Sequence, residues 1–537
     1  MAKQKPYSLV NVYPSGYFVV PNHGLKNYFT RVRLGQPEEY RTTFAKNENL
    51  ADVLDDWDRE LQSLADTWPS LYEYETAMRE KVGPMSIMKP LVERMDDIEH
   101  YYLDVTLHAK SLDQQDLDSV VNEWSVSKPL TLFSRTSTWD QMRKNTNAGN
   151  PSFAKRNRVG NKILNSELTD YVEDLGFTKV YWDHDEFGIC AVLGWRGQEG
   201  GIEPDDVKQR VVWMFPASVN LEELRLYYPL VQYAQTNELV PAWHSMELVD
   251  TCITRMFDTK DKADLVMCTD FTRFDQHFNS KLQDGARYIL AQLFHGRDEN
   301  NWLKEVFPIK YVIPLMYDYG KLITGLHGMG SGSGGTNADE TLVHRALQYE
   351  AARAQGSRLN KFSQCLGDDG VLTYPGLDPD LLVKSYSSHG LEMNPDKQDL
   401  SDVECTYLRR WHHIKYRRDG ICVGVYSTNR AIGRLCEQER FYAPKDWGPK
   451  MVALRQLSIL ENCKFHPMAV QFVKWCMKRD KYRLGIDIPG FLDNIDLEAK
   501  EATAHMPDFL GYTKSEMLDS RGGISRWWIV KTLKSLS

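Results

Sequence analysis

The chain has 537 residues, of which 42% are hydrophobic and 26% are charged, values close to those of ordinary soluble globular proteins. This composition argues against a disordered or fibrous protein, and the length predicts roughly three or four structural units. The formal net charge of -9 argues mildly against a surface coated with positive charge. A nucleic-acid-binding role would therefore need its basic side chains gathered in an internal channel.

The cysteines and the apolar runs bear on the compartment. There are nine cysteines, an odd number with no Cys-x-x-Cys pair, which indicates a reduced, intracellular protein. The first residues lack the continuous apolar stretch of a signal peptide, and no apolar run approaches the roughly 18 residues of a membrane helix. The sequence therefore predicts neither secretion nor membrane insertion.

The N-terminal region combines extended aromatic segments with one stretch of helical periodicity. Six apolar residues recur there at the spacing of one helix face: Leu50, Val53, Leu54, Trp57, Leu61 and Leu64. This predicts an N-terminal extension, residues 1 to about 85, packed on a larger body. Further along, Gly, Pro, Asn and clustered basic residues indicate exposed loops, among them TNAGNP with Thr146, Gly149 and Pro151.

The segment VKQRVVWMF is predicted to be a strand on which Lys208 and Arg210 alternate, so that both side chains point to one face. Two cations on one face could hold a triphosphate and neutralise the charge that develops on a leaving pyrophosphate. An exposed edge strand guarded by charges explains the pattern equally well.

The segment ADLVMCTDFTRFD, residues 263–275, is predicted to be a buried strand that runs into a turn, followed by a stretch with helical periodicity. Asp270 ends the apolar strand, and Asp275 stands five residues later, near the start of the helix. A strand of this kind can deliver its last carboxylate into a cleft. The alternative for Asp270 is a helix N-cap.

A glycine-rich loop, GLHGMGSGSGG at 325–335, precedes a strong helix candidate. Consecutive glycines such as Gly332 let the backbone approach a nucleotide or a template closely. Thr336 followed by Asp339 also satisfies a helix-start signature. A flexible linker is the alternative. The loop lacks the Gly-Lys-Ser/Thr ending of a phosphate-binding P-loop, so an ATPase interpretation fails.

The sharpest feature is Gly367, Asp368 and Asp369 in FSQCLGDDGVLTY, which is predicted to form two short strands joined by a tight turn. Glycine tolerates the positive φ that such a turn demands, and the turn presents two carboxylates. A pair of Mg²⁺ ions needs several carboxylates from different elements, and Asp270 with this pair could supply them. A solvated surface turn is the alternative.

In order, these four segments resemble the motifs of viral RNA-dependent RNA polymerases. Lys208 and Arg210 resemble motif F of the fingers, Asp270 to Asp275 motif A, Ser331 to Thr336 motif B, and Gly367 to Asp369 motif C. Softer resemblances are TNAGNP to motif G at the template entrance, NPDKQ with Lys397 to motif D, and TYLRRW, Thr406 to Trp411, to the primer-grip motif E. DFTRFDQHF with GSGSGGTNADET is similar to the polymerases of picobirnaviruses, which have segmented double-stranded RNA genomes.

The resemblance implies an α+β fold, a closed right hand of fingers, palm and thumb, with an antiparallel palm sheet backed by helices. The predicted boundaries are 1–85 for the N-terminal extension, 86–258 and 278–324 for the fingers, 259–277 and 325–424 for the palm, and 425–537 for the thumb and C-terminal segment.

The resemblance also implies an RNA-directed RNA polymerase that replicates and transcribes a viral genome. Asp270, Asp368 and Asp369 would hold two Mg²⁺ ions, with Mn²⁺ able to substitute, and Lys397 would protonate the leaving pyrophosphate. The implied nucleotide-binding residues are Lys208, Arg210, Asp275, Ser331, Gly332, Thr336 and Asn337, and the implied template-binding residues are Thr146, Gly149 and Pro151. The expected partners are RNA template and product, nucleoside triphosphates and the capsid interior, and no membrane is expected among them. The expected locations are the virion interior and the host cytoplasm.

One departure concerns the ribose. In many relatives an Asn stands four positions after the motif B Thr and pairs with the second motif A Asp to sense the 2′ hydroxyl. Here that position is Glu340, and the nearest Asn is Asn337.

Two other functions remain as alternatives to an RNA-dependent RNA polymerase: a reverse transcriptase and a noncatalytic RNA-binding capsid component.

Two further features carry less weight. Four residues could form a zinc cluster, but their spacing matches no common site: Cys405, His412, His413 and Cys422. Trp527 and Trp528 are interpreted as core residues rather than base-stacking platforms.

Overall fold

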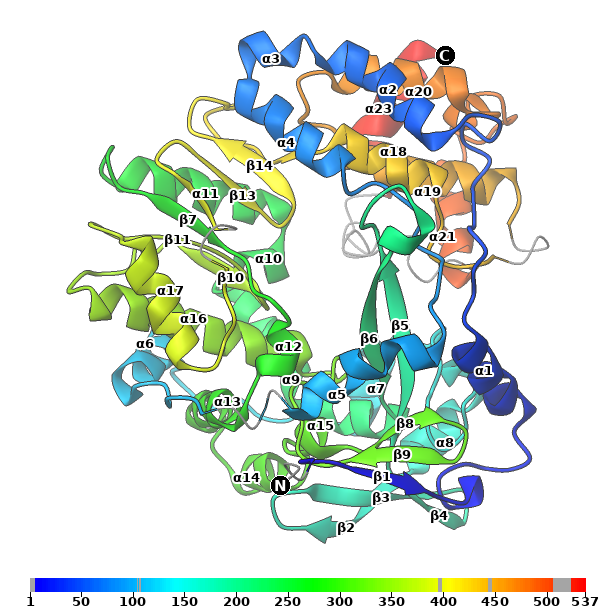
Figure 1. Cartoon of the computed structure of the whole chain (residues 1–537), viewed down its shortest axis with the longest axis vertical. Coiled ribbons are helices and arrows are strands. Elements are labelled where there is room, and N and C mark those ends of the chain that lie inside the picture. Colours follow the sequence, from blue (N-terminus) through cyan, green and yellow to red (C-terminus); the bar gives the residue numbers. More distant parts are fainter. Residues whose placement is uncertain (1–4, 104, 106–107, 395–397, 443–446, 506–522) are drawn as a thin grey trace.

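The computed structural model describes residues 5–103, 105, 108–394, 398–442, 447–505 and 523–537. The chain combines many helices with four separate sheets, which confirms the predicted α+β class (Figure 1). Within the described residues, no helix has the length and apolar character needed to cross a membrane. Figure 1 shows three bodies arranged in a ring: the predicted palm, a body of two further sheets, and a helical bundle.

The predicted palm contains a four-stranded sheet in the order β10-β11-β7-β12, in which every pairing is antiparallel. Its strands are β7 (Val266–Thr269), β10 (Gln364–Leu366), β11 (Asp369–Thr373) and β12 (Asp399–Ser401). Both faces of this sheet are covered, which explains the uninterrupted apolar run of β7. Met267 faces a core shared with helices on one side, whereas Val266 and Cys268 face a smaller core on the other.

The helices around this sheet include those that the sequence predicted after the motif A strand and after the glycine-rich loop. They are α6 (Gln114–Trp124), α10 (Pro241–His244), α11 (Met246–Thr259), α12 (Phe274–His277), α13 (Ser280–Leu293), α16 (Thr336–Ala354) and α17 (Pro379–Ser388). Helix α16 is buried along most of its length, because α6, α13, α17 and β10 pack around it. The prediction of an antiparallel sheet backed by helices is confirmed.

A second body is built on a five-stranded sheet in the order β1-β9-β8-β5-β6 and a three-stranded sheet in the order β2-β3-β4. The strands are β1 (Ser8–Asn11), β5 (Ala191–Gln198), β6 (Lys208–Met214), β8 (Leu315–Asp318) and β9 (Lys321–Thr324), with β2 (Glu167–Val172), β3 (Gly176–Trp182) and β4 (Asp185–Gly188). The accompanying helices are α1 (His23–Leu34), α5 (Met95–Leu103), α7 (Arg135–Gln141), α8 (Gly160–Asn165), α9 (Ala217–Thr236), α14 (Arg297–Glu305) and α15 (Ile309–Val312).

The helical bundle combines both ends of the chain. From the N-terminal region come α2 (Leu50–Leu61), α3 (Leu64–Thr67) and α4 (Pro69–Arg79), and from the C-terminal region α18 (Thr428–Cys436), α19 (Pro449–Glu461), α20 (Ala469–Arg479), α21 (Ile495–His505) and α23 (Trp528–Leu536). A small sheet of β13 (Glu404–Tyr407), β14 (Arg410–His413) and β15 (Val425–Tyr426) joins this bundle to the palm. The six-part division of the chain stays a prediction.

One hydrophobic core holds the bundle together, and α2 enters it with the apolar face that its periodicity predicted. Trp57 is 1% exposed and its ring lies 4.8 Å from that of Phe472 and 5.3 Å from that of Trp475, measured between centroids. Its indole N–H donates to Thr428 Oγ1 at 2.8 Å. Trp527 is buried in the same core, which confirms its interpretation as a packing residue.

Trp57→Ala should destabilise the protein strongly, since it leaves a cavity between segments that are far apart in the sequence. We expect a loss of about 3–5 kcal/mol, measured by urea unfolding followed by circular dichroism. Leu34→Ala is the matched control, because Leu34 is 73% exposed and its truncation should change little. Equal unfolding midpoints in the two variants would contradict a shared core.

Candidate active site

The palm sheet brings the predicted metal ligands together. In the β11–β7 ladder Gly370 pairs with Thr269, so one step further along the two chains Asp369 faces Asp270. The turn between β10 and β11 places Asp368 beside them, and Gly367 in this turn has a φ of 58°. Gly370 also needs to be glycine, because a Cβ there would lie 2.5 Å from Thr269 Oγ1.

Helix α16 holds this turn by both backbone groups of Gly367. The Gly367 N–H donates to Thr341 Oγ1 at 2.8 Å, and the Gly367 carbonyl lies 2.8 Å from His344 Nδ1. Burial lowers the pKa of His344 to about 4, so the imidazole is neutral near pH 7. A carbonyl can only accept, so Nδ1 carries the hydrogen and donates it.

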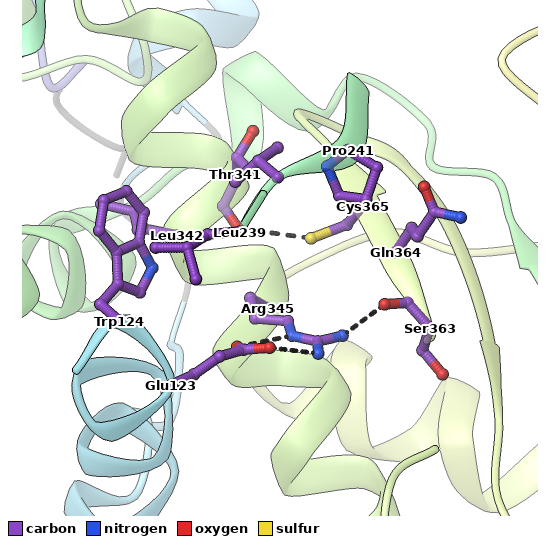
Figure 2. A pocket seen from close by; sticks show the side chains of 11 residues that line it. Glu123, Trp124, Leu239, Pro241, Thr341, Leu342, Arg345, Ser363, Gln364 and Cys365 are labelled. Carbon is purple, nitrogen blue, oxygen red and sulfur yellow. Dashed lines mark hydrogen bonds and ion pairs between the residues drawn. The ribbon is translucent and has the colours of Figure 1, made fainter. Parts of the chain in front are cut away.

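The next turn of α16 holds strand β10 in the same way. Arg345 Nη1 donates to the Ser363 carbonyl at 2.8 Å, and Gln348 Nε2 donates to the Gln364 carbonyl at 2.9 Å. Arg345 in turn makes a two-pronged pair with Glu123 of α6, at 2.6 and 3.0 Å (Figure 2). These four α16 side chains, Thr341, His344, Arg345 and Gln348, are called the α16 ladder below. The ladder fixes the β10–β11 hairpin against the helix.

Desolvation and the charges of neighbouring carboxylates both act on the two aspartates of the turn. Desolvation, followed by repulsion from Asp369 and Asp275, raises the pKa of Asp368 to about 7, although Arg210 acts in the opposite direction. Desolvation and the charge of Asp270 also raise the pKa of Asp369. Among the residues that the structure describes, no Lys, Arg or His forms an ion pair with any of the three. Unpaired carboxylates from two strands and a turn offer the oxygen ligands that hard cations take, so the donor set fits divalent metal ions.

Gln398 fixes the backbone beyond the end of β7. Its side-chain Oε1 accepts from the Asp270 N–H at 3.0 Å, and its Nε2 donates to the Asp270 carbonyl at 3.0 Å. The sequence analysis singled out the neighbouring Lys397 and missed Gln398, whose only signal was its place in NPDKQ. Lys397 itself lies outside the described residues.

The predicted cation pair lies on β6, the edge strand of the five-stranded sheet, with both side chains exposed. Arg210 is close enough to Asp368 and Asp369 to act against the rise in their pKa. Neither Lys208 nor Arg210 forms an ion pair with another residue in the described ranges. The structure thus places Arg210 near the aspartates and Lys208 near Lys81, and the phosphate-binding role that the resemblance implied stays a prediction.

Two further cations gather at the same place. The sequence analysis named the segment that contains Arg409, as a resemblance to motif E, but it missed Lys81. Arg409, at the tip of the β13–β14 hairpin, opposes the rise in the pKa of Asp369, and the Tyr74 hydroxyl of α4 donates to the Arg409 carbonyl at 2.7 Å. Desolvation and the nearby charge of Lys208 lower the pKa of Lys81, which follows α4. Lys81 had no sequence signal, because only the packing of the N-terminal region brings it here.

The glycine-rich loop lies against β6. Its Ser331 carbonyl accepts from the Trp213 N–H at 2.9 Å, and a Cβ on Gly332, whose φ is 141°, would lie 1.9 Å from the Trp213 carbonyl oxygen. Close approach of two backbones therefore explains Gly332. Thr336 is the first residue of α16, after Gly335 as N-cap, and its hydroxyl lies 3.4 Å from the Gly330 carbonyl.

The predicted helix-start signature is wrong, because Gly335 rather than Thr336 is the N-cap and Asp339 does not cap α16. It is fully buried, accepts from the hydroxyls of Tyr227 and Tyr311 at 2.7 Å each, and pairs with the buried Lys310 at 3.2 Å. Three neighbours that satisfy this carboxylate outweigh a local cap.

Asp275 lies in α12, as its spacing predicted, and accepts from the Ser331 hydroxyl. Asn337 does not reach it: its Oδ1 accepts from Trp243 Nε1 of α10 at 2.7 Å. Glu340 lies close to Asp275 instead, and desolvation, followed by the charge of Asp275, raises the pKa of Glu340. The ribose-sensing role stays untested.

The predicted template-binding segment lies where β6 ends and α9 begins. Thr146 is half-buried, whereas Gly149 and Pro151 are buried. Gly149 has a φ of 65°, and a Cβ there would lie 2.6 Å from the carbonyl oxygen of Phe215. Because Gly149 and Pro151 are buried, residues beside them would have to make any contact with the template. The template-binding role of Thr146, Gly149 and Pro151 stays a prediction.

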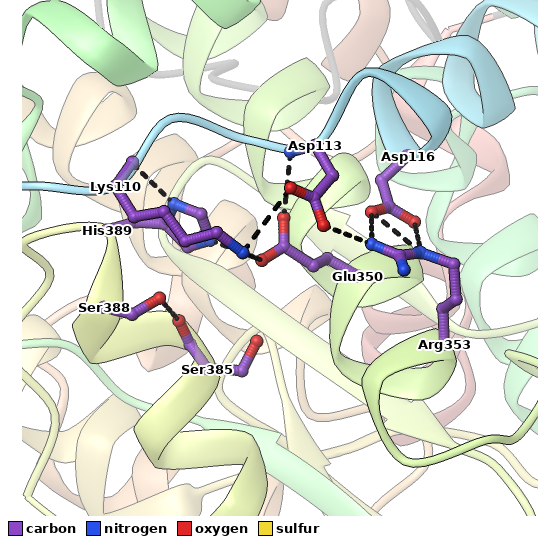
Figure 3. A network of polar contacts seen from close by, with 8 residues as sticks. All are labelled: Lys110, Asp113, Asp116, Glu350, Arg353, Ser385, Ser388 and His389. Carbon is purple, nitrogen blue, oxygen red and sulfur yellow. Dashed lines mark hydrogen bonds and ion pairs between the residues drawn. The ribbon is translucent and has the colours of Figure 1, made fainter.

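A second acidic cluster lies elsewhere in the palm. Oxygens of Asp113, Asp116 and Glu350 lie within 4.8 Å of one another. Arg353 binds Asp116 with two nitrogens, at 2.7 and 3.0 Å, and His389 Nε2 lies 2.8 Å from Glu350 (Figure 3). Because cations already neutralise it, we interpret this cluster as an ion network that joins α6, α16 and α17.

The zinc alternative gains no support. Cys405 and His412 are cross-strand partners, but within the described residues they belong to no group of metal-ligating side chains. His412 Nδ1 instead lies 3.1 Å from the Cys422 carbonyl.

An antiparallel sheet presents facing aspartates, with Arg210, Arg409 and Lys81 nearby and a glycine-rich loop against the neighbouring strand β6. This combination defines the class: a template-directed polymerase with a right-hand fold. The chain belongs to the viral RNA-dependent RNA polymerases, whose family model, "Viral RNA-dependent RNA polymerase", matches residues 195–431. It is 53% identical over 527 residues to the "Potential RNA-dependent RNA polymerase" of a human picobirnavirus (strain Human/Thailand/Hy005102/-), which covers 97% of this chain and 98% of that protein.

Solved structures agree. The crystal structure of the RNA-dependent RNA polymerase of a human picobirnavirus superposes with a TM-score of 0.93 at 52% identity, covering 98% of this chain and all of that one. A mutant of such a polymerase with its insertion loop deleted gives a TM-score of 0.92 at 50% identity, with the same coverage. The closed right-hand fold is thus confirmed, and the chain is an RNA-dependent RNA polymerase.

Thr341→Val should weaken the turn that carries Asp368, because it leaves the buried Gly367 N–H without an acceptor. We expect a stability loss of about 1–3 kcal/mol. Displacement of the carboxylates should slow RNA synthesis roughly tenfold to a hundredfold. Thr341→Ser keeps the hydroxyl and should stay close to wild type in both measurements. Equal activity of the Val and Ser variants would show that the α16 ladder does not position the turn.

Proposed function

We propose that this polymerase replicates and transcribes the segmented double-stranded RNA genome of a picobirnavirus by two-metal nucleotidyl transfer. The carrying observation is the gathering of Asp270, Asp368 and Asp369 with no ion-pair partner among the described residues. The relative from a human picobirnavirus supports the choice of genome.

In this mechanism Asp270, Asp368 and Asp369 would hold two Mg²⁺ ions, for which Mn²⁺ could substitute. When bound, such a pair supplies Lewis acidity at the RNA 3′ hydroxyl and at the triphosphate. The protein contributes position: the α16 ladder, Gln398 and the β7–β11 pairing keep the carboxylates in place. Catalysis is then orientation and charge stabilisation rather than covalent chemistry.

The basic side chains bind the phosphates in this mechanism. Lys208 and Arg210 bind the triphosphate and offset charge on the departing pyrophosphate, and Lys81 and Arg409 extend this positive surface. Lys397 protonates the pyrophosphate as a general acid.

The remaining site residues contact the nucleotide and the template. Ser331, Gly332 and Thr336 lie beside the nucleotide, and Thr146, Gly149 and Pro151 guide the template. The partners are RNA template, RNA product and nucleoside triphosphates.

We also propose that the enzyme works inside the capsid, in the virion interior and the host cytoplasm. This proposal is supported only by the kinship with a viral polymerase. Co-expression with the capsid protein, followed by purification of particles, tests it: the polymerase should remain in nuclease-treated and protease-treated particles. Its complete loss from those particles would reject the interior location.

Asp270→Ala and Asp369→Ala should each abolish synthesis without unfolding the protein. Loss of one metal ligand removes several kcal/mol of stabilisation, on the order of a thousandfold in rate. The assay uses an unprimed RNA template, Mg²⁺ and labelled ribonucleotides or deoxynucleotides, which also separates this enzyme from a reverse transcriptase. Mg²⁺ or Mn²⁺ should raise the melting temperature of the wild type but not of Asp369→Ala.

Asp402→Ala is the control for this series, because Asp402 is an exposed acid of the same region. It should keep both synthesis and the metal-dependent rise in melting temperature. Substantial synthesis by Asp270→Ala or Asp369→Ala would overturn the metal assignment.

Lys208→Ala and Arg210→Ala should raise the KM for nucleotides and also lower kcat, because a phosphate clamp acts in the ground state and in the transition state. One lost charge-assisted contact predicts roughly a tenfold to hundredfold fall in kcat/KM. Steady-state kinetics measure this, with Lys26→Ala of α1, another exposed lysine, as control. An unchanged nucleotide KM in both variants would reject the phosphate-binding role.

A further inference from the structure

Helix α9 contacts both the predicted template-binding segment and the glycine-rich loop. The helix begins beside the template-binding segment, where the Ala217 N–H donates to the Ala148 carbonyl at 2.7 Å. One turn further along, Asn220 and Glu223 stand three positions apart and therefore share one face of the helix. Both side chains are buried, at 5% and 0% exposed, and both hydrogen-bond the glycine-rich loop.

Glu223 binds the glycine-rich loop at two points. Its Oε2 accepts from the Ser333 hydroxyl, and its Oε1 accepts from the Gly334 N–H at 3.2 Å. The Ser333 hydroxyl oxygen in turn accepts from the Gly335 N–H at 3.0 Å. A Cβ on Gly335 would lie 2.3 Å from the ring of Tyr227, another α9 residue, so the loop lies directly against this helix. The carboxylate thus fixes the three residues that lead into α16.

Asn220 connects this contact to the template-binding segment. Its Nδ2 donates to Glu223 Oε1 at 3.2 Å and to the Gly332 carbonyl at 3.4 Å, and its Oδ1 accepts from Arg156 Nη2 at 2.8 Å. The Arg156 backbone N–H donates to the Thr146 carbonyl at 2.9 Å. The four side chains of this chain of hydrogen bonds are called the α9 network below: Arg156, Asn220, Glu223 and Ser333.

A buried carboxylate is a costly way to pack one helix against a loop, because it must find donors to replace water. Among the described residues no Lys, Arg or His forms an ion pair with Glu223. Desolvation raises the pKa of Glu223, and the charge of Lys310 opposes that rise. An apolar side chain would fill the same space without this cost. Costs of this kind concentrate where position serves function.

We propose that the α9 network positions the glycine-rich loop relative to the template, which makes Asn220 and Glu223 positioning residues for templated incorporation. The inference rests on the proposed nucleotide and template roles of the two segments and adds the connection between them. The template base chooses the nucleotide, so the two segments must keep their relative place while the choice is made. Asn220 and Glu223 act through the backbone of these segments and touch no substrate themselves.

The measurement is kcat/KM for one ribonucleotide that matches the template base and for one that does not. Partial unfolding lowers both values equally, so their ratio reports position rather than the amount of folded enzyme. We expect Asn220→Ala and Glu223→Ala each to lower the ratio of matched to mismatched incorporation by roughly tenfold. Gln232→Ala, which changes an exposed residue of the same helix, is the control and should leave the ratio unchanged.

Glu223→Gln separates hydrogen bonding from charge. The amide keeps an oxygen for the Gly334 N–H and offers an N–H to the Ser333 hydroxyl oxygen, so the ratio should stay within about threefold of wild type. A loss as large as that of Glu223→Ala would contradict a positioning role through hydrogen bonds.

A double-mutant cycle tests whether the network acts as a unit. Asn220→Ala and Ser333→Ala alter groups that meet only through Glu223, so the double variant should lose little more than the stronger single variant. Losses that multiply would show that the two residues act independently and would overturn the connection.

The remaining outcomes are separable. If Glu223→Ala fails to fold, Asn220→Ala and Ser333→Ala still decide, with melting temperatures recorded for every variant. A matched-to-mismatched ratio that stays at the wild-type value in both folded variants rejects this inference alone. A wild type that incorporates no matched ribonucleotide rejects the proposed function with it.

Discussion

The mutual repulsion of Asp270, Asp368 and Asp369 is the constraint on which the rest of the structure depends. Left to themselves, three carboxylates of like charge would move apart, so the protein must hold their backbone from several directions. The β7–β11 pairing sets the distance between two of the chains, Gln398 clamps Asp270, and the α16 ladder clamps Gly367. A rigid support of this kind keeps the metal ligands in position before the cations bind.

Part of this arrangement follows from local chemistry, and that part was predictable. The apolar run that ends at Asp270, the glycine turn before Asp368 and the alternation of Lys208 and Arg210 are properties of short segments, and each strand formed where predicted. The contacts of Gln398, in contrast, depend on which elements pack together. A sequence pattern shows which face a side chain takes, but not which distant partner it meets.

The helix start of α16 shows why local rules failed where they did. Thr336 and Asp339 have the spacing of a capping signature, yet Asp339 turns inward to two tyrosines and Lys310. Glu340 follows the same logic: an acid beside Asp275 is costly unless it is neutral, and nothing in the spacing reveals its burial. Local conflicts of this kind concentrate where a protein binds its substrate, because function demands groups that folding alone would avoid.

The N-terminal region explains how one chain closes into a ring. Strand β1 extends the five-stranded sheet through β9, whereas α2 to α4 pack into the bundle with the C-terminal helices. After α4 the chain returns to the five-stranded sheet, where the Lys89 N–H donates to the Gln209 side chain of β6 and that side chain donates to the Ile87 carbonyl, at 3.2 Å each. The segment therefore connects the two bodies without passing through the palm. Such a connection limits how far they can separate, and it carries Lys81 to the carboxylates. The basic side chains gathered near the aspartates stand out in a chain whose formal net charge is -9.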